Sequence, residues 1–179
     1  MSMTSASRSG GIDTTSGVKA ADHPVHPLFV VIRVLLGVFF ISVFAANVGK
    51  GLYGAGGYAE LIRGYADEGS TIGIWKEVMR LVADGAVVAS KLQAVTELAF
   101  GVLLVSGLLT RITGIAAGIH LTTLFISEIG VPDLWFWELP FIALTAFSIA
   151  AVSAGRRLGL DAYLLDRPPL SGLPRRLRG

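Results

Sequence analysis

The sequence predicts an all-α integral membrane protein: a four-helix bundle with amphipathic helices in a long extracytoplasmic connection between its first and second spans. Of its 179 residues, 53% are hydrophobic and only 16% are charged, and the mean hydropathy is +0.66. Soluble domains rarely combine these values. Four apolar stretches approach the ~20 helical residues that cross a ~30 Å hydrocarbon core. The basic residues cluster beside these stretches, as topology signals do.

The first span is expected at residues 28–48. Residues 1–26 are rich in Ser, Thr and Gly and show no apolar periodicity, which predicts a disordered cytoplasmic tail. Pro27 suits the first turn of a helix. Arg33 lies little more than one turn inside the span, so we expect its side chain to reach back to the near membrane interface, with a structural ion pair and a ligand contact as the alternatives.

The long connection begins with a glycine-rich turn at residues 49–57 and continues with two amphipathic stretches. Apolar side chains at helical spacing form one face of each stretch, made by Tyr58, Leu61, Ile62 and Tyr65 in the first, and by Ile74, Trp75, Val78, Met79, Val82 and Ala86 in the second. Neither is apolar enough all round to span a bilayer. We expect both helices to lie on the membrane surface or to cap the mouth of the bundle.

The remaining spans are expected at residues 92–109, 112–127 and 139–152. The link at residues 110–113 is so short that the second and third spans should be antiparallel neighbours. Gly114 and Gly118 form a small-residue pair that lets backbones approach closely. An aromatic run at residues 135–137 resembles an interfacial belt. Residues 27–165 thus form one transmembrane domain, followed by a basic Pro- and Arg-rich cytoplasmic tail at residues 166–179.

The distribution of basic residues predicts the topology. With the tails and the Arg111 turn on one side, that side carries ten of the fifteen Lys and Arg residues. This bias places both termini in the cytoplasm of a multi-pass protein of the inner or plasma membrane. It also argues against nucleic acid as a partner and for membrane lipids, since the charge lies beside the spans.

Glu97 lies inside the second span, where an ionisable side chain costs about 2.5–3.5 kcal/mol and usually faces a bundle interior. The predicted topology brings polar side chains from all four spans to the outer half of the bundle, namely Asn47, Lys50, Lys91, Gln93, Glu97, His120 and Glu138. Such a pocket suits a quinone headgroup. Glu97 and His120 are then the catalytic candidates that handle protons, and the other five are candidate headgroup contacts.

A structural alternative stays open, in which Glu97 pairs with Lys50 or Lys91 and only holds helices together. Glu128 and Glu138, nearer water, also suit a solvated rim. The absence of cysteine excludes thiolate metal sites and dithiol chemistry by the chain itself, so a redox role requires a bound cofactor or a partner subunit. No metal-ligand cluster is apparent, and bis-histidine haem would need a second buried histidine.

Three segments resemble the DoxX/DoxD family of small four-helix membrane proteins across residues 28–165. They are Glu97-x3-Gly101-x5-Gly107-Leu-Leu-Thr-Arg111, the closing Ala154-Gly-Arg-Arg-Leu-Gly-Leu-Asp-Ala162, and Tyr58-Ala-Glu-Leu-Ile-Arg-Gly64 with Trp75 downstream. The last is similar to the DoxD-like branch, subunits of thiosulfate:quinone oxidoreductase. The resemblance implies a membrane subunit of a quinone-linked oxidoreductase with a partner redox subunit.

Two other functions remain open from the sequence: a non-catalytic scaffold for a redox or stress-defence complex, and a small-molecule or lipid transporter. The electron donor and the oligomeric state, including a homo-oligomer, also stay open.

Overall fold

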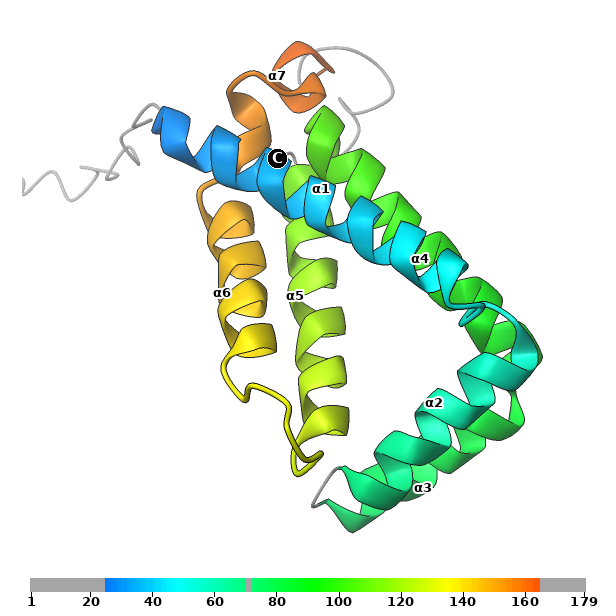
Figure 1. Cartoon of the computed structure of the whole chain (residues 1–179). Helices are drawn as coiled ribbons and strands as arrows, with labels where there is room; N and C mark the ends of the chain where they lie inside the picture. Colours follow the sequence, from blue (N-terminus) through cyan, green and yellow to red (C-terminus); the bar gives the residue numbers. More distant parts are fainter. Residues whose placement is uncertain (1–24, 70–71, 165–179) are drawn as a thin grey trace, which may run out of the picture.

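The computed structural model describes residues 25–69 and 72–164. Over these ranges the chain is all-α, with seven α-helices, one short 3-10 helix and no strand, as the sequence predicts (Figure 1). The helices are α1 (Pro27–Gly49), α2 (Ala55–Glu68), α3 (Gly73–Asp84), α4 (Ala86–Ser106), α5 (Thr110–Glu128), α6 (Glu138–Ala151), η1 (Ala154–Arg156) and α7 (Leu160–Leu164). The predicted tails at residues 1–26 and 166–179 lie, apart from residues 25 and 26, outside the described residues.

Two of the described helices, α1 and α4, are long and apolar enough to cross a membrane by length and composition. Only 22% of the most apolar window of each is buried, so neither is the enclosed core helix of a soluble domain. Helix α5 has 19 residues but is less apolar. Helix α6 has 14 residues and rises roughly 21 Å, which is less than the hydrocarbon core.

The long helices form two pairs, α1 with α4 and α5 with α6, and each pair packs through glycine. A Cβ atom placed on Gly37 of α1 would lie 2.8 Å from the backbone nitrogen of Val105 on α4. One on Gly114 of α5 would lie 2.8 Å from the carbonyl oxygen of Ala146 on α6, and Gly118 meets the ring of Phe147. The predicted close approach at Gly114 and Gly118 is therefore confirmed, with α6 as the partner.

The two pairs meet at one end of the molecule and diverge toward the other (Figure 1). Apolar side chains fill the space where they meet, chiefly Leu36, Phe40, Leu104, Ala117, Leu121, Ala146 and Ile149. Helices α4 and α5 follow one another directly, but each packs mainly within its own pair. The expected second and third spans are thus neighbours joined by a tight turn, although their contact is less extensive than the contact within each pair.

At the end where the pairs meet, the C-terminal segment folds back over Arg33. The Arg33 side chain is only 1% exposed, and its Nη2 donates to the carbonyl oxygen of Leu158 at 3.1 Å. Asp161, also 1% exposed, accepts from the backbone N–H groups of Leu109 at 2.7 Å and Thr110 at 2.8 Å. The expectation that Arg33 reaches the interface is wrong, because this segment covers it. We call Arg33, Asp161 and the turn at residues 107–110 the clamp.

At the diverging end, α2 and α3 form a hairpin with its own small core (Figure 1). The core consists of Tyr58, Ile62, Ala66, Met79, Ala83 and Ala86. Exposed ion pairs between Arg63 and Asp84 and between Arg80 and Asp67 join the two helices. The expected helices are confirmed, and the apolar face of α3 is only partly buried in the hairpin. Ile74 is 78% exposed, because α3 turns Met79 and Ala83 toward α2.

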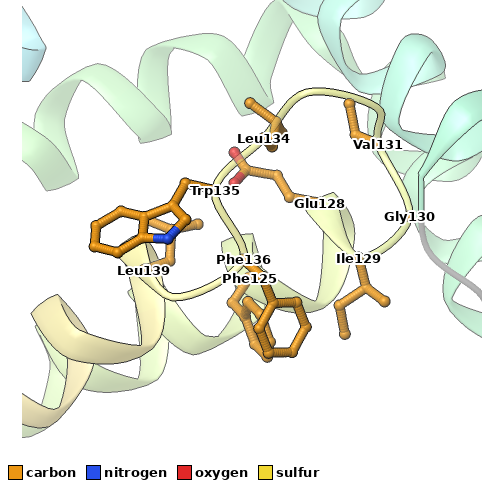
Figure 2. Close-up of a pocket in the computed structure, with 9 residues that line it drawn as sticks. All are labelled: Phe125, Glu128, Ile129, Gly130, Val131, Leu134, Trp135, Phe136 and Leu139. Carbon is orange, nitrogen blue, oxygen red and sulfur yellow. The ribbon is translucent and has the colours of Figure 1, made fainter.

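The turn between α5 and α6 carries exposed aromatic side chains at Trp135, Phe136 and Trp137. Figure 2 shows this turn folded over the end of α5, and the ring centroids of Phe125 and Phe136 lie 5.0 Å apart. The cavity beneath the turn measures about 50 Å³. It could hold only a few water molecules, so the candidate ligand site lies elsewhere.

Candidate functional site

A cavity of about 400 Å³ lies between the helix pairs and the α2–α3 hairpin. Its volume falls in the range of small-molecule sites. The apolar part of its wall comes mainly from Phe39, Phe40, Val43, Leu121, Leu124 and Leu139. The polar part comes from Asn47, Lys50, Tyr53, Tyr58, Tyr65, Gln93, Glu97, His120, Glu128 and Glu138. The cavity therefore suits an amphipathic ligand that has an apolar body and a polar end.

Glu97 on α4 is the centre of the polar wall and is 3% exposed. Its Oε1 accepts from Gln93 Nε2 at 2.6 Å and from Asn47 Nδ2 at 3.3 Å. Its Oε2 accepts from Asn47 Nδ2 at 3.1 Å and from the Tyr53 hydroxyl. All three partners are neutral donors. They come from α1, α4 and the connection between α1 and α2, so the carboxyl group is fully surrounded by hydrogen bonds despite its burial.

His120 on α5 joins this network through Gln93. The Nε2 atoms of the two side chains lie 3.4 Å apart, and the His120 ring meets the edge of Phe100 at a centroid distance of 5.7 Å. A continuous polar chain thus runs from Tyr53 through Glu97 and Gln93 to His120. It connects the two helix pairs across the cavity.

A second acidic group lies at the end of α5, where the cavity opens. The Tyr65 hydroxyl donates to Glu128 Oε1 at 3.0 Å. Burial raises the pKa of Glu128, the hydrogen bond from Tyr65 opposes that rise, and the neighbouring Glu138 carboxylate adds to it. Burial also raises the pKa of the Tyr65 hydroxyl, which therefore stays protonated and able to donate at neutral pH. Lys50 and Glu138 line the same opening and are exposed.

The structure brings six of the seven sequence-predicted site residues to this one cavity, namely Asn47, Lys50, Gln93, Glu97, His120 and Glu138. It does not bring Lys91 there. The Lys91 side chain donates from Nζ to the carbonyl oxygen of Tyr53 at 3.1 Å and so supports the glycine-rich connection from outside. Within residues 25–69 and 72–164, Glu97 forms no ion pair with Lys50 or Lys91, so the structural alternative of a Glu97–Lys pair is not realised.

Sequence reasoning missed three tyrosines that line the cavity. Tyr58 and Tyr65 were assigned to the packing face of an amphipathic helix, and Tyr53 to a flexible turn. The available signal was the seven-residue spacing of Tyr58 and Tyr65. It places two hydroxyl groups on one face of α2, where a face used only for packing needs none.

Comparisons of the chain with models of protein families, with curated proteins and with solved structures find no match. The resemblance to the DoxX/DoxD family stays a prediction, and the function is argued below from the geometry of the cavity.

Proposed function

We propose that the protein spans a membrane four times, through α1, α4, α5 and α6, with the hairpin on the outer side. Each of these helices carries apolar side chains that are more than half exposed, such as Leu35, Val95, Ile119 and Leu144. Soluble monomers rarely present apolar surface of this extent. The exposed aromatic turn before α6 supplies an interfacial segment that completes this short span. The bias of basic residues then favours cytoplasmic termini.

Because the chain contains no cysteine, single reporter cysteines test this topology directly. A cysteine replacing Glu60 on the hairpin should react with a membrane-impermeant maleimide in intact cells. One replacing Arg111 at the α4–α5 turn should react only after permeabilisation. The opposite labelling pattern would reverse the topology, and labelling of both in intact cells would contradict four spans.

We further propose that the cavity binds the ring of a quinone and that the protein is the quinone-binding membrane subunit of an oxidoreductase complex. The observation that carries this proposal is the buried Glu97 network on the wall of a 400 Å³ cavity with aromatic and aliphatic sides. A flat ring fits between apolar walls, and its oxygen atoms require polar partners at the ends. When bound, a quinone supplies two-electron chemistry coupled to two protons.

The chain's own residues supply position and proton handling. Phe39 and Phe40 contribute the apolar wall that excludes water. Glu97 and His120 are the two groups of the polar chain that can take up or release a proton, and Gln93 lies between them. Since the chain has no cysteine, electrons have to reach the site from another bound group or from a partner subunit.

The proposal is tested by Glu97→Gln in the full-length protein, purified in mild detergent, with a short-chain benzoquinone as the probe. The substitution replaces a carboxyl acceptor with an amide and disturbs the network of Tyr53, Asn47 and Gln93. We expect the affinity for the quinone to fall tenfold or more, since hydrogen bonds to a charged group contribute about 1.5–3 kcal/mol each. Glu60→Gln, on the exposed face of α2, is the matched control. Equal affinity in the Glu97→Gln and control proteins would remove Glu97 from the site.

Mass spectrometry of the gently purified protein separates this function from transport or lipid binding. A co-purified quinone, or a redox subunit that co-purifies with the protein, would support the proposal. A phospholipid in the cavity, together with no quinone binding by the purified protein, would contradict it.

A further inference from the structure

The end of the molecule opposite the cavity carries an exposed surface that combines apolar and basic side chains. Leu158 is 80% exposed and Tyr163 is 63% exposed, and Leu160 is exposed as well. Arg156 and Arg157, which precede them in the chain, are also exposed. All five lie on the C-terminal segment that covers the clamp, at the end where the two helix pairs meet (Figure 1). We call these five residues the α7 patch.

The charge at this end of the molecule is almost entirely positive. The segments that meet here, residues 25–36, 104–115 and 150–164, contain four arginines and one acidic residue, Asp161. Asp161 is 1% exposed and accepts hydrogen bonds from the α4–α5 turn, so its charge is withheld from the surface. Residues 165–179, outside the described residues, add four more arginines and one aspartate to the sequence. This surface therefore suits an anionic partner.

A hydrogen bond fixes the level of the α7 patch relative to the first helix. Arg157 Nη1 donates to the carbonyl oxygen of Val25 at 2.7 Å, and α1 begins two residues later at Pro27. The exposed apolar surface of α1 starts at once, with Leu28. In the proposed four-span topology, the start of α1 marks the boundary between the cytoplasm and the hydrocarbon core. The α7 patch then lies at the level of the lipid headgroups.

The clamp explains why an apolar side chain of this segment stays exposed. Leu158 has a φ of 52°, in the left-handed region that leucine rarely adopts. Its carbonyl oxygen accepts from Arg33 Nη2 at 3.1 Å, which holds this conformation. A Cβ atom on Gly159 would lie 2.4 Å from Arg33 Nη1, so the backbone packs directly on the guanidinium group and the Leu158 side chain remains outside. A leucine held in this way gains from burial against a partner.

We propose that the α7 patch binds anionic phospholipids of the cytoplasmic leaflet, with Arg156 and Arg157 at the headgroup phosphates and the three apolar side chains at the boundary of the acyl chains. Arginine clusters beside a membrane span attract anionic headgroups, and apolar side chains between them enter the interface. The acyl-chain boundary accounts for the apolar side chains as well as for the arginines. A soluble acidic partner accounts only for the arginines.

Bound lipid also stabilises the clamp, because the same segment supplies the Leu158 carbonyl to Arg33 and the Asp161 carboxylate to the α4–α5 turn. Opening the clamp would remove this segment from the membrane surface, so a lipid that binds the closed form favours the folded state. The inference rests on the proposed four-span topology and not on the quinone proposal.

The first test compares thermal unfolding of the full-length protein in nanodiscs of phosphatidylcholine with unfolding in nanodiscs of equal parts phosphatidylcholine and phosphatidylglycerol. We expect Tm to be about 4–8 °C higher in the anionic discs, given two arginines near the surface and a chain of this length. Salt at about 1 M should remove most of this difference, since it shortens the Debye length to about 3 Å.

Arg156→Gln combined with Arg157→Gln should reduce the difference in Tm between the two lipids by half or more. The matched control is Arg63→Gln combined with Arg80→Gln, which removes two exposed arginines from the hairpin at the other end of the molecule. The control should keep the full difference, whatever its own Tm in phosphatidylcholine.

The second test asks whether the apolar side chains enter the membrane. Because the chain has no cysteine, a single cysteine replacing Tyr163 can carry a polarity-sensitive fluorophore. In anionic liposomes, a quencher attached to the lipid acyl chains should reach this label, whereas iodide in the water should quench it weakly. The same fluorophore on a cysteine replacing Glu60, on the exposed face of α2, should show the opposite pattern.

Equal Tm values of the wild-type protein in the two lipids would overturn the inference. So would an undiminished lipid effect in the double variant of Arg156 and Arg157, or equal iodide quenching of the labels at positions 163 and 60. If soluble polyglutamate raised Tm in phosphatidylcholine discs as much as phosphatidylglycerol does, the patch would be a site for an acidic protein and the lipid inference would be wrong.

The reporter cysteines at Glu60 and Arg111 separate this inference from the topology on which it rests. If they label as expected for four spans while phosphatidylglycerol has no effect, the topology stands and only the α7 patch has been misread. If both label in intact cells, the proposed topology and the inference fail together.

Discussion

Replacing Asp161 by Asn should destabilise the protein far more than an ordinary Asp→Asn change. The Asp161 carboxylate accepts from the backbone N–H groups of Leu109 and Thr110, where the α4–α5 turn enters α5, and it lies close enough to Arg33 to interact with its buried charge. Arg33 Nε and Nη1 have no hydrogen-bond partner among the described residues. An asparagine would present one donor where two acceptors are needed and would leave the guanidinium charge without its counter-charge.

The size of the effect follows from these contacts. Hydrogen bonds to a charged group contribute about 1.5–3 kcal/mol each, and the buried guanidinium group of Arg33 also loses a nearby negative charge. These contributions overlap, because they involve the same carboxylate. We therefore expect a loss of about 3–5 kcal/mol. For a chain of this length that corresponds to a fall in Tm of roughly 6–20 °C.

Thermal unfolding in detergent, followed by intrinsic tryptophan fluorescence, measures the shift. The matched control is Asp67→Asn, which removes an exposed contact with Arg80 at 3.5 Å and should cost about 0–1 kcal/mol. Adding Arg33→Met to Asp161→Asn should recover part of the lost stability, since it removes the unpaired buried charge. Near-equal Tm values for Asp161→Asn and Asp67→Asn would refute this account of the clamp.

Two further predictions concern helix packing and the cavity opening. Gly37→Ala should lower the free energy of unfolding by about 1–3 kcal/mol, because its Cβ would lie 2.8 Å from the Val105 nitrogen. Gly64→Ala, with open space around it on α2, should raise the free energy of unfolding by about 0.5–1 kcal/mol. Thermal unfolding checks both signs, and a stabilising Gly37→Ala would contradict the close contact between α1 and α4. Tyr65→Phe should raise the pKa of Glu128 further, because it removes the hydrogen bond that favours the ionised form. Infrared titration of the carboxyl group should then move to higher pH, and an unchanged titration would argue that the bond is absent.

The positions of the long helices could be predicted because they depend on local composition. The first span, expected at residues 28–48, is α1 at Pro27–Gly49, and the fourth, expected at 139–152, is α6 at Glu138–Ala151. The environment of Arg33 could not be predicted. Its hydrogen-bond partner, Leu158, is 125 residues away in the chain, and no local sequence pattern indicates that the C-terminal segment folds back over Arg33.

Part of the candidate site could likewise be predicted from the sequence, and part could not. Gln93 and Glu97 are four residues apart on one helix, so their shared face follows from helical geometry. Lys91 is six residues from Glu97, a rotation of roughly 240°, so the same geometry should have excluded it from the cavity. Tyr53 could not be predicted, because its pairing with Glu97 depends on where the glycine-rich connection leads the chain.

The clamp also has a consequence for the size of the cavity at the far end of the molecule. The clamp holds the two helix pairs together at one end. The distance between their other ends therefore depends on what packs between them there. In this protein the α2–α3 hairpin, which has its own core and ion pairs, packs at this end. Changing the size of the side chains in the hairpin should therefore alter the width of the cavity, and so the size of the ring that it can bind, without any substitution in α1, α4, α5 or α6.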